Sequence, residues 1–172
     1  LYNLKEKVEK VLEHSEKVEK VAAKILDQQS IFYLGRGLDY MIAVEGALKS
    51  KEISYIHSEA FASGELKHGT IALIDEGVPV VINVTQSDLF DKSVSNIKEV
   101  VARGAYVIAV AKEGNTLVEE VADEVFYIPA VEDEYTGFLS IIIHQLLAYY
   151  LSKLKGNDVD KPRNLAKSVT VE

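Results

Sequence analysis

The chain has 172 residues, 27 acidic against 19 basic side chains, a formal net charge of −8, and no cysteine. This length is enough for one domain with a continuous core. The lack of cysteine excludes disulfides, thiolate metal ligands and a cysteine nucleophile, and the negative charge argues against a protein that binds nucleic acid through phosphate contacts.

No stretch of the sequence approaches the roughly 18 consecutive apolar residues that cross a membrane. The opening LYNLKEKVEK is too charged for the apolar centre of a signal peptide. We therefore expect a cytoplasmic protein with no membrane partner. The first residue is Leu rather than Met, so we also expect the sequence to belong to a longer chain.

The first 30 residues form a lead segment, and residues 1–28 have the pattern of one amphipathic helix. Apolar residues recur at alternating spacings of four and three, with Ser15 filling one place of the series: Leu4, Val8, Val11, Val18, Ala22 and Ile25. A coiled coil is the alternative, but the segment is short for one. We expect a helix that docks on the domain.

Five short segments then have the composition of strands, and helical patterns separate them. The expected strands lie at residues 31–35, 54–57, 78–84, 105–111 and 124–129, and the helices at 39–52, 88–103, 116–122 and 134–153. Strands that alternate with helices indicate a parallel sheet covered on both faces. The predicted fold class is α/β: a flavodoxin-like three-layer sandwich with a five-stranded parallel sheet at residues 31–153, followed by a tail at residues 154–172.

Charged residues crowd the segment 45–69, where the pattern predicts the end of a helix, a strand and a polar loop. Glu45, Lys49 and Glu52 lie at positions i, i+4 and i+7, on one stripe of the helix. Exposed ion pairs are one interpretation. The other is a cleft in which Lys49 keeps Glu52 ionised and Glu52 moves a proton between neighbouring carbons.

The histidines indicate further chemistry. His68 lies in a polar turn bracketed by glycines and could act as an acid–base group near neutral pH, although a surface histidine is the alternative. His57 with Glu59, and Glu65 with His68, could hold a metal, but the gap between the two pairs fits no metal signature, so we expect none. His144, within an apolar helix, is predicted to be a core histidine with its hydrogen bonds satisfied.

Two turns follow predicted strands, at the sheet edge where ligands bind in such folds. Gly35-Arg36-Gly37 would let a ligand approach the backbone, but it lacks the third glycine of a dinucleotide fingerprint. Thr85-Gln86-Ser87 opens a helix, where an anion can bind backbone amides. Because Asp88 and Asp91 would repel a phosphate there, we favour simple N-capping by Ser87.

The tail carries a net positive charge, with five basic and three acidic residues in 153–172, and it lacks helical periodicity. A solvated tail is one interpretation. The other is that the tail folds over an anionic small ligand, in which case Lys167 could reach a carbonyl group and form a Schiff base.

Three segments together resemble one known family. EGALKSKEISYIHSEAFASGELKHG (residues 45–69), LGRG (34–37) and DKPRNLAKSVTVE (160–172) are similar to the carboxyl-terminal part of the glucosamine-6-phosphate synthases, the glutamine–fructose-6-phosphate aminotransferases. The resemblance covers essentially the whole chain. It implies the second of the two sugar isomerase (SIS) domains that form the isomerase half of those enzymes.

The resemblance implies roles for four residues. Glu52 resembles the base that moves the proton between C1 and C2 in ketose-to-aldose isomerisation, and Lys49 resembles the lysine that accompanies it. His68 resembles the histidine that opens the sugar ring and serves the neighbouring subunit across a dimer interface. Lys167 resembles the tail lysine that forms a Schiff base with fructose-6-phosphate.

The resemblance also implies partners and limits. It implies a homodimer, a sugar-phosphate substrate, other domains of the same enzyme that supply ammonia from glutamine, and neither a cofactor nor a metal. The family commonly has HGP where this chain has His68-Gly69-Thr70, and its phosphate loop is a Ser/Thr-rich loop of the first SIS domain, of which Thr85-Gln86-Ser87 resembles a counterpart. We therefore do not expect these residues alone to perform the whole reaction. The alternative is a non-catalytic sugar-phosphate-binding or regulatory SIS module.

Overall fold

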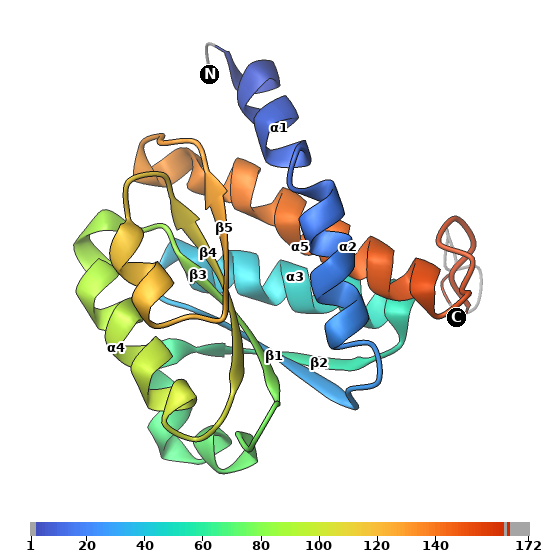
Figure 1. The fold of residues 1–172 in the computed structure, drawn as a ribbon, viewed down its shortest axis with the longest axis horizontal. Helices are drawn as coiled ribbons and strands as arrows, with labels where there is room; N and C mark the ends of the chain where they lie inside the picture. Colours follow the sequence, from blue (N-terminus) through green and yellow to red (C-terminus); the bar gives the residue numbers. More distant parts are fainter. Residues whose placement is uncertain (1–2, 164, 166–172) are drawn as a thin grey trace, which may run out of the picture.

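The computed structural model of the chain describes residues 3–163 and 165, and its centre is one parallel sheet (Figure 1). The five strands are β1 (Ser30–Gly35), β2 (His57–Ala62), β3 (Pro79–Val84), β4 (Tyr106–Lys112) and β5 (Glu124–Ile128). They lie in the order β2-β1-β3-β4-β5, and every neighbouring pair is parallel. This is the flavodoxin-like order, and the predicted fold class is confirmed.

Helices cover both faces of the sheet. One face carries α1 (Leu4–Leu12), α2 (Ser15–Lys24), α3 (Leu38–Ser54) and α5 (Thr136–Leu154), and the other carries α4 (Phe90–Val101) with short 3₁₀ turns (Figure 1). Side chains of a strand point alternately to the two faces, so Tyr33 packs under α3 and α5 while Leu34 packs under α4. All six residues of β3 are buried, which explains why this strand is an uninterrupted apolar run.

The lead segment is two helices, so the prediction of one helix over residues 1–28 is wrong. Helix α1 ends at Leu12 and α2 begins at Ser15. At the break the ring Nε2 of His14 donates to the carbonyl oxygen of Tyr127, at 2.8 Å, and Lys17 Nζ donates to that of Val125, at 2.8 Å. The bend thus aligns both helices with β5, and the prediction that the segment docks on the domain is confirmed, since both helices contribute to the core.

Helix α5 is a core helix. By length and composition alone, the span Asp133–Leu154, with a mean hydropathy of 1.2, would suffice to cross a membrane. In the fold this helix packs against α3, α2 and α1. Its buried residues, which line the sheet-facing side, include Leu139, Ile143, Leu147 and Leu151. Packing within the domain therefore accounts for the apolar residues on this side of the helix.

The strand predicted at residues 54–57 is misplaced. Helix α3 continues to Ser54, whose Oγ donates to the carbonyl oxygen of Ser50 at 2.7 Å, and β2 begins only at His57. Since β2 is at the edge of the sheet, five of its six residues are exposed or partly exposed, including Glu59. The polar loop expected after β2 forms a 3₁₀ helix at Ser63–His68.

Candidate active site

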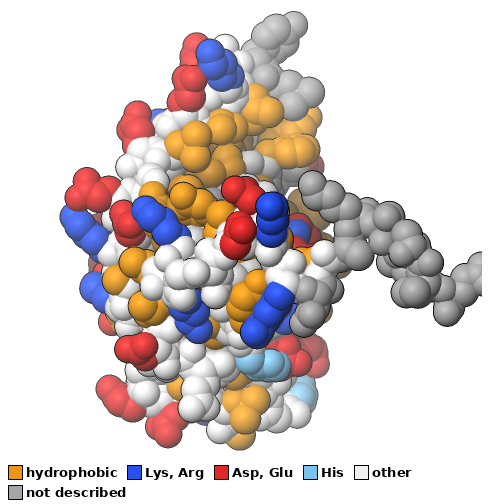
Figure 2. All heavy atoms as spheres, turned by 90° about the vertical axis from the view of Figure 1, so that its right-hand side faces the viewer, with side chains coloured by type: hydrophobic (Ala, Val, Ile, Leu, Met, Phe, Trp, Pro, Cys, Tyr) orange, Lys and Arg blue, Asp and Glu red, His pale blue; other side chains and the backbone are white. Residues whose placement is uncertain are grey.

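A pocket of about 400 Å³ lies where the last turn of α3 meets the start of β2 and the carboxyl-terminal segment. Its lining comes from three parts of the chain: Lys51, Glu52, Tyr55, Ile56, His57, Arg163 and Leu165. Acidic and basic side chains are interspersed on the face of the molecule beyond the end of α5 (Figure 2). The pocket therefore lies on a surface of mixed charge, where a carboxylate and cations are both within reach of a small ligand.

Lys49 and Glu52 form a close ion pair beside this pocket. Lys49 Nζ is 2.7 Å from a Glu52 carboxylate oxygen and 3.4 Å from one of Glu45. Both members of the closer pair are partly buried, with 31% and 28% of their side chains exposed. The hydrogen bond to Glu52 raises the pKa of Lys49, so Lys49 is a cation at neutral pH. The spacing prediction of one charged stripe is confirmed.

The Glu52 pocket is at the edge of the sheet where the strands begin. His57, the first residue of β2, lines the pocket and pairs with Ser30, the first residue of β1. The Gly35-Arg36-Gly37 turn is at the other end of α3, and the rise of a helix separates Gly37 from Glu52 by roughly 22 Å. The Gly35-Arg36-Gly37 turn therefore does not belong to the Glu52 pocket.

His68 does not meet Glu52 within this chain. It follows the end of β2, whereas Glu52 precedes the start of that strand, and a six-residue strand spans roughly 17 Å. The His68 side chain is 75% exposed and its Nε2 is 3.8 Å from a Glu65 carboxylate oxygen. This exposed position far from Glu52 agrees with two interpretations of His68: a residue that acts in the site of another subunit, and a surface histidine.

The paired histidines and acids do not form a metal site within the part of the chain that the structure describes. His57 Nε2 is 3.7 Å from Glu59, and this pair is separated from His68 and Glu65 by the length of β2. No group of three or more His, Asp or Glu side chains among residues 3–163 and 165 is arranged to hold an ion. The four residues of the metal hypothesis are thus not brought together.

The tail reaches the pocket as far as it is described. Arg163 and Leu165 line the pocket, and Lys167 lies outside the described residues. The amide of Asn157 donates to the carbonyl oxygen of Ile53, at 3.1 Å, and so fixes the start of the segment to the last turn of α3. The described part of the tail therefore lies beside Glu52, and the prediction that the tail contributes to the active site stays a prediction.

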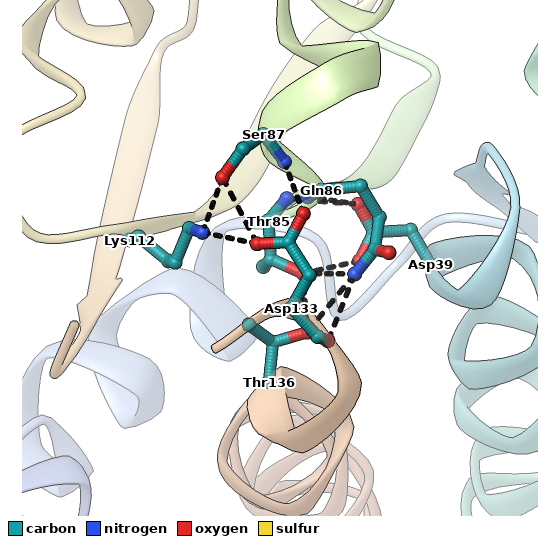
Figure 3. A network of polar contacts seen from close by, with 7 residues as sticks. All are labelled: Asp39, Thr85, Gln86, Ser87, Lys112, Asp133 and Thr136. Carbon is teal, nitrogen blue, oxygen red and sulfur yellow. Dashed lines mark hydrogen bonds and ion pairs between the residues drawn. The ribbon is translucent and has the colours of Figure 1, made fainter. Parts of the chain in front are cut away.

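A polar network lies at the carboxyl ends of the strands, where the strand order reverses between β1 and β3 (Figure 3). Ser87 donates to the Asp133 carboxylate from its backbone N–H, at 2.6 Å, and from its hydroxyl, at 2.9 Å. Lys112 Nζ contacts the same carboxylate at 2.5 Å and the Ser87 hydroxyl at 2.7 Å. Burial would raise the pKa of Asp133, but the bonds from Lys112 and Ser87 outweigh this and lower it.

This network corrects the N-cap prediction. Neither the 3₁₀ turn at Ser87–Leu89 nor α4 has a side-chain cap hydrogen bond, because the Ser87 hydroxyl faces Asp133 and Lys112 instead (Figure 3). A carboxylate of the chain itself thus accepts the donors that an anionic ligand would need. The sequence argued against phosphate binding at this turn because Asp88 and Asp91 would repel the anion. In the structure the reason is that Asp133 already accepts the donors of Ser87.

Asp39 is the most deeply buried acid of the network, with 1% of its surface exposed. Its carboxylate accepts the backbone N–H of Thr85 at 2.8 Å and contacts the Thr85 hydroxyl at 2.5 Å (Figure 3). Burial raises the pKa of Asp39, and the hydrogen bonds from Thr85 only partly offset this. Asp39 therefore ties the start of α3 to the end of β3.

The sequence interpretation missed Asp39, Lys112 and Asp133. Lys112 ends a buried strand and Thr85 follows one, so their positions at the ligand-binding edge were readable from the strand pattern. Asp133 and Asp39 carried no such signal, because their partners are 21 or more residues away along the chain.

His144 is a core residue, as predicted. It is fully buried, and its Nε2 lies 2.9 Å from the amide oxygen of Asn83. Its Nδ1 has no hydrogen-bond partner among the described residues, so the prediction of full satisfaction is wrong for this atom. Burial lowers the pKa of His144 to about 4, and the ring is therefore neutral at pH 7.

Comparison with known proteins extends the resemblance to the whole chain. The glutamine–fructose-6-phosphate aminotransferase (isomerizing) of Clostridium acetobutylicum is 62% identical over 172 residues, which are 100% of this chain and 28% of that protein. The solved C-terminal domain of glucosamine-fructose-6-phosphate aminotransferase from Francisella tularensis is 41% identical with a TM-score of 0.86, over 93% of this chain and 46% of that one. Tagatose-6-phosphate ketose/aldose isomerase from Escherichia coli shares the fold, at 21% identity and a TM-score of 0.71 over 94% of this chain and 47% of that one.

The chain thus spans just over a quarter, 28%, of the length of the curated relative. The family model described as the SIS domain matches residues 24–154, from the end of α2 to the end of α5. This match takes in the whole parallel sheet, α3 with Lys49 and Glu52, and the turn with His68. The chain belongs to the SIS domain family.

Proposed function

We propose that this SIS domain supplies the proton-transfer part of the isomerase site in a glutamine–fructose-6-phosphate aminotransferase that makes glucosamine-6-phosphate. The observation that carries the proposal is the position of Glu52, 2.7 Å from Lys49 and in one pocket with Arg163 and Leu165 of the carboxyl-terminal segment. The high identity to such an aminotransferase supports it.

In this proposal Glu52 acts as a carboxylate base. It accepts the proton from one of the two carbons C1 and C2 of the sugar and returns it to the other, while the Lys49 ammonium keeps the carboxylate ionised between turnovers. Lys167 forms the Schiff base with the ketone of fructose-6-phosphate, and it lies only four residues beyond Arg163.

The remaining parts of the site come from a second copy of this chain and from other domains of the enzyme. His68, exposed and distant from Glu52, opens the sugar ring in the site of the neighbouring subunit, so the enzyme is a dimer. The phosphate group is held by another domain, because the donors of Ser87 and Lys112 are engaged by Asp133. Ammonia comes from a glutaminase domain, and the enzyme is cytoplasmic.

The test is Glu52→Gln in the full-length enzyme, with formation of glucosamine-6-phosphate as the readout. Gln keeps the shape of the side chain but cannot accept the proton, so we expect the rate to fall by at least about 100-fold. The matched control is Glu45→Gln, which also removes a partner of Lys49 but does not line the pocket, and we expect a change of less than about threefold.

The rival proposal is a non-catalytic module that binds or senses a sugar phosphate. It predicts that Glu52→Gln leaves turnover intact and changes only the affinity for the sugar. Unchanged turnover in the Glu52→Gln enzyme would refute the catalytic assignment and favour the rival.

A further inference from the structure

Tyr55 has an unusual backbone conformation at the end of α3. Its φ and ψ are 60° and 16°, in the left-handed region, and among the described residues only Asn3 shares a positive φ without being glycine. For a residue with a bulky side chain this conformation costs roughly 1–2 kcal/mol. Such strain persists where surrounding contacts hold the residue in place, and it is concentrated at functional positions.

Two contacts from the Tyr55 side chain hold the carboxyl-terminal segment. The Tyr55 hydroxyl accepts the backbone N–H of Arg163 at 2.9 Å. The guanidinium carbon of Arg163 lies 4.1 Å from the centre of the Tyr55 ring, close enough for a cation–π contact. One aromatic side chain therefore grips both the backbone and the side chain of a residue that is 108 positions away.

The segment between α5 and Arg163 is held at its start as well. Ser152 Oγ and the Asn157 amide both donate to the carbonyl oxygen of Ile53, at 2.9 and 3.1 Å. The Asp158 carboxylate then accepts the backbone N–H groups of Asp160 and Lys161, at 3.0 and 3.2 Å, which forms a tight turn. The turn directs the chain back to α3, where Tyr55 completes the attachment.

These contacts end at the mouth of the Glu52 pocket. Tyr55 and Arg163 both line it, and Glu52 is three residues before Tyr55, in the last turn of α3. Lys167 is the fourth residue after Arg163, and an extended chain covers at most about 14 Å over that distance. The attachment of Arg163 to Tyr55 therefore fixes the described end of the segment beside Glu52.

We infer that Tyr55 is a positioning residue that clamps Arg163 and thereby holds the carboxyl-terminal segment at the Glu52 pocket. Its role in the reaction rests on the function proposed above, but the clamp itself does not. The left-handed conformation follows from this arrangement, because the contacts with Arg163 compensate for the strain of Tyr55.

The clamp can be tested on this chain by limited digestion with trypsin, which cleaves after Arg163. The readout is the rate of cleavage after Arg163, followed by mass spectrometry as the loss of chains that contain the Arg163–Asn164 bond, whether or not Lys167 has been cut, and normalised to cleavage within the helices. Tyr55→Asn removes both contacts and tolerates the left-handed backbone, so we expect cleavage about 10-fold faster. Tyr55→Phe keeps the ring and loses the hydroxyl, so we expect about threefold. The control Tyr149→Phe, at an exposed tyrosine of α5, should be cleaved at the wild-type rate.

The role in the reaction is tested by the same variants in the full-length enzyme. We expect Tyr55→Asn to lower kcat/KM for fructose-6-phosphate by about 10-fold and Tyr55→Phe to retain most of it. Cleavage of Tyr55→Asn at the wild-type rate would overturn the clamp. Faster cleavage with unchanged kcat/KM would overturn the positioning role, whereas intact turnover in the Glu52→Gln enzyme would overturn the proposed function and leave the clamp standing.

Discussion

Protonation of the buried His144 should destabilise this fold in mild acid. Protonation of Glu and Asp side chains should therefore not be the whole cause of its acid sensitivity. The ring is fully buried between Gly46, Tyr33 and Asn83, and its pKa is lowered from 6.5 to about 4. The unfolded chain therefore binds a proton at this histidine near pH 6.5, but the folded protein does so only near pH 4. The stability that the neutral ring contributes is thus complete above pH 6.5 and is lost as the pH falls toward 4.

The size of the effect follows from the two pKa values, 6.5 and about 4. Their difference corresponds to a full loss of about 3 kcal/mol once both states are protonated. Most of this falls within an accessible range, because between pH 7 and pH 5 the term amounts to about 2 kcal/mol. That is a large share of the 5–15 kcal/mol by which a typical domain is stable.

The assay is urea unfolding of the wild type and of His144→Gln at pH 7 and pH 5. Gln can still donate to Asn83 but has no proton to bind, so the wild type should lose about 2 kcal/mol more than the variant on acidification. His57→Gln, at a histidine with 65% of its side chain exposed, is the control and should follow the wild type. If the stability gap between wild type and His144→Gln is the same at both pH values, the linkage argument is wrong.

Two further predictions concern buried contacts of α3, at its start and at its middle. Asp39→Ala leaves the Thr85 N–H and hydroxyl without their acceptor and should cost about 3 kcal/mol in unfolding free energy. Asp39→Asn should cost much less than Asp39→Ala, and an equal cost for both variants would contradict this. Because the carboxyl pKa of Asp39 is raised, the wild type loses stability as the pH rises above 3.8, and Asp39→Asn does not. The stability of Asp39→Asn relative to the wild type should therefore increase at high pH. Gly46→Ala would place a methyl group 2.8 Å from Cγ of the buried His144 ring and should lower Tm despite the better helix propensity, whereas Gly137→Ala meets only the flexible end of Ile42 and should leave Tm nearly unchanged. A stabilised Gly46→Ala protein would show that the ring can move aside.

The parts of the fold that the sequence predicts are those set by local composition. The run Val78–Val84 identifies β3 because both faces of that strand are covered and every position must be apolar. The charged stripe of α3 is equally local, since i, i+3 and i+4 spacing alone brings Lys49 to Glu45 and Glu52. β2 was misplaced because an edge strand tolerates charged residues such as Glu59, which weakens the apolar signal.

The parts that escaped prediction depend on contacts between distant segments. The break between α1 and α2 is favoured by carbonyl groups of β5, about 110 residues away, which no periodicity within the lead segment records. The same holds for Asp133 at Ser87 and for Tyr55 at Arg163. A resemblance between sequences could name Glu52 and Lys49, but the residues that position them become visible only when the chain is folded.

The break between α1 and α2 has a consequence for solubility. β5 is the last strand of the sheet, and among residues 3–163 and 165 its outer side has no partner strand. Two of the carbonyl groups at that side, on Val125 and Tyr127, accept hydrogen bonds from Lys17 and His14. A strand from another molecule would need these same acceptors to extend the sheet. We therefore expect the bent N-terminal helices to hinder edge-to-edge aggregation. A chain without them would leave these carbonyl groups of β5 free to pair with a strand of another molecule.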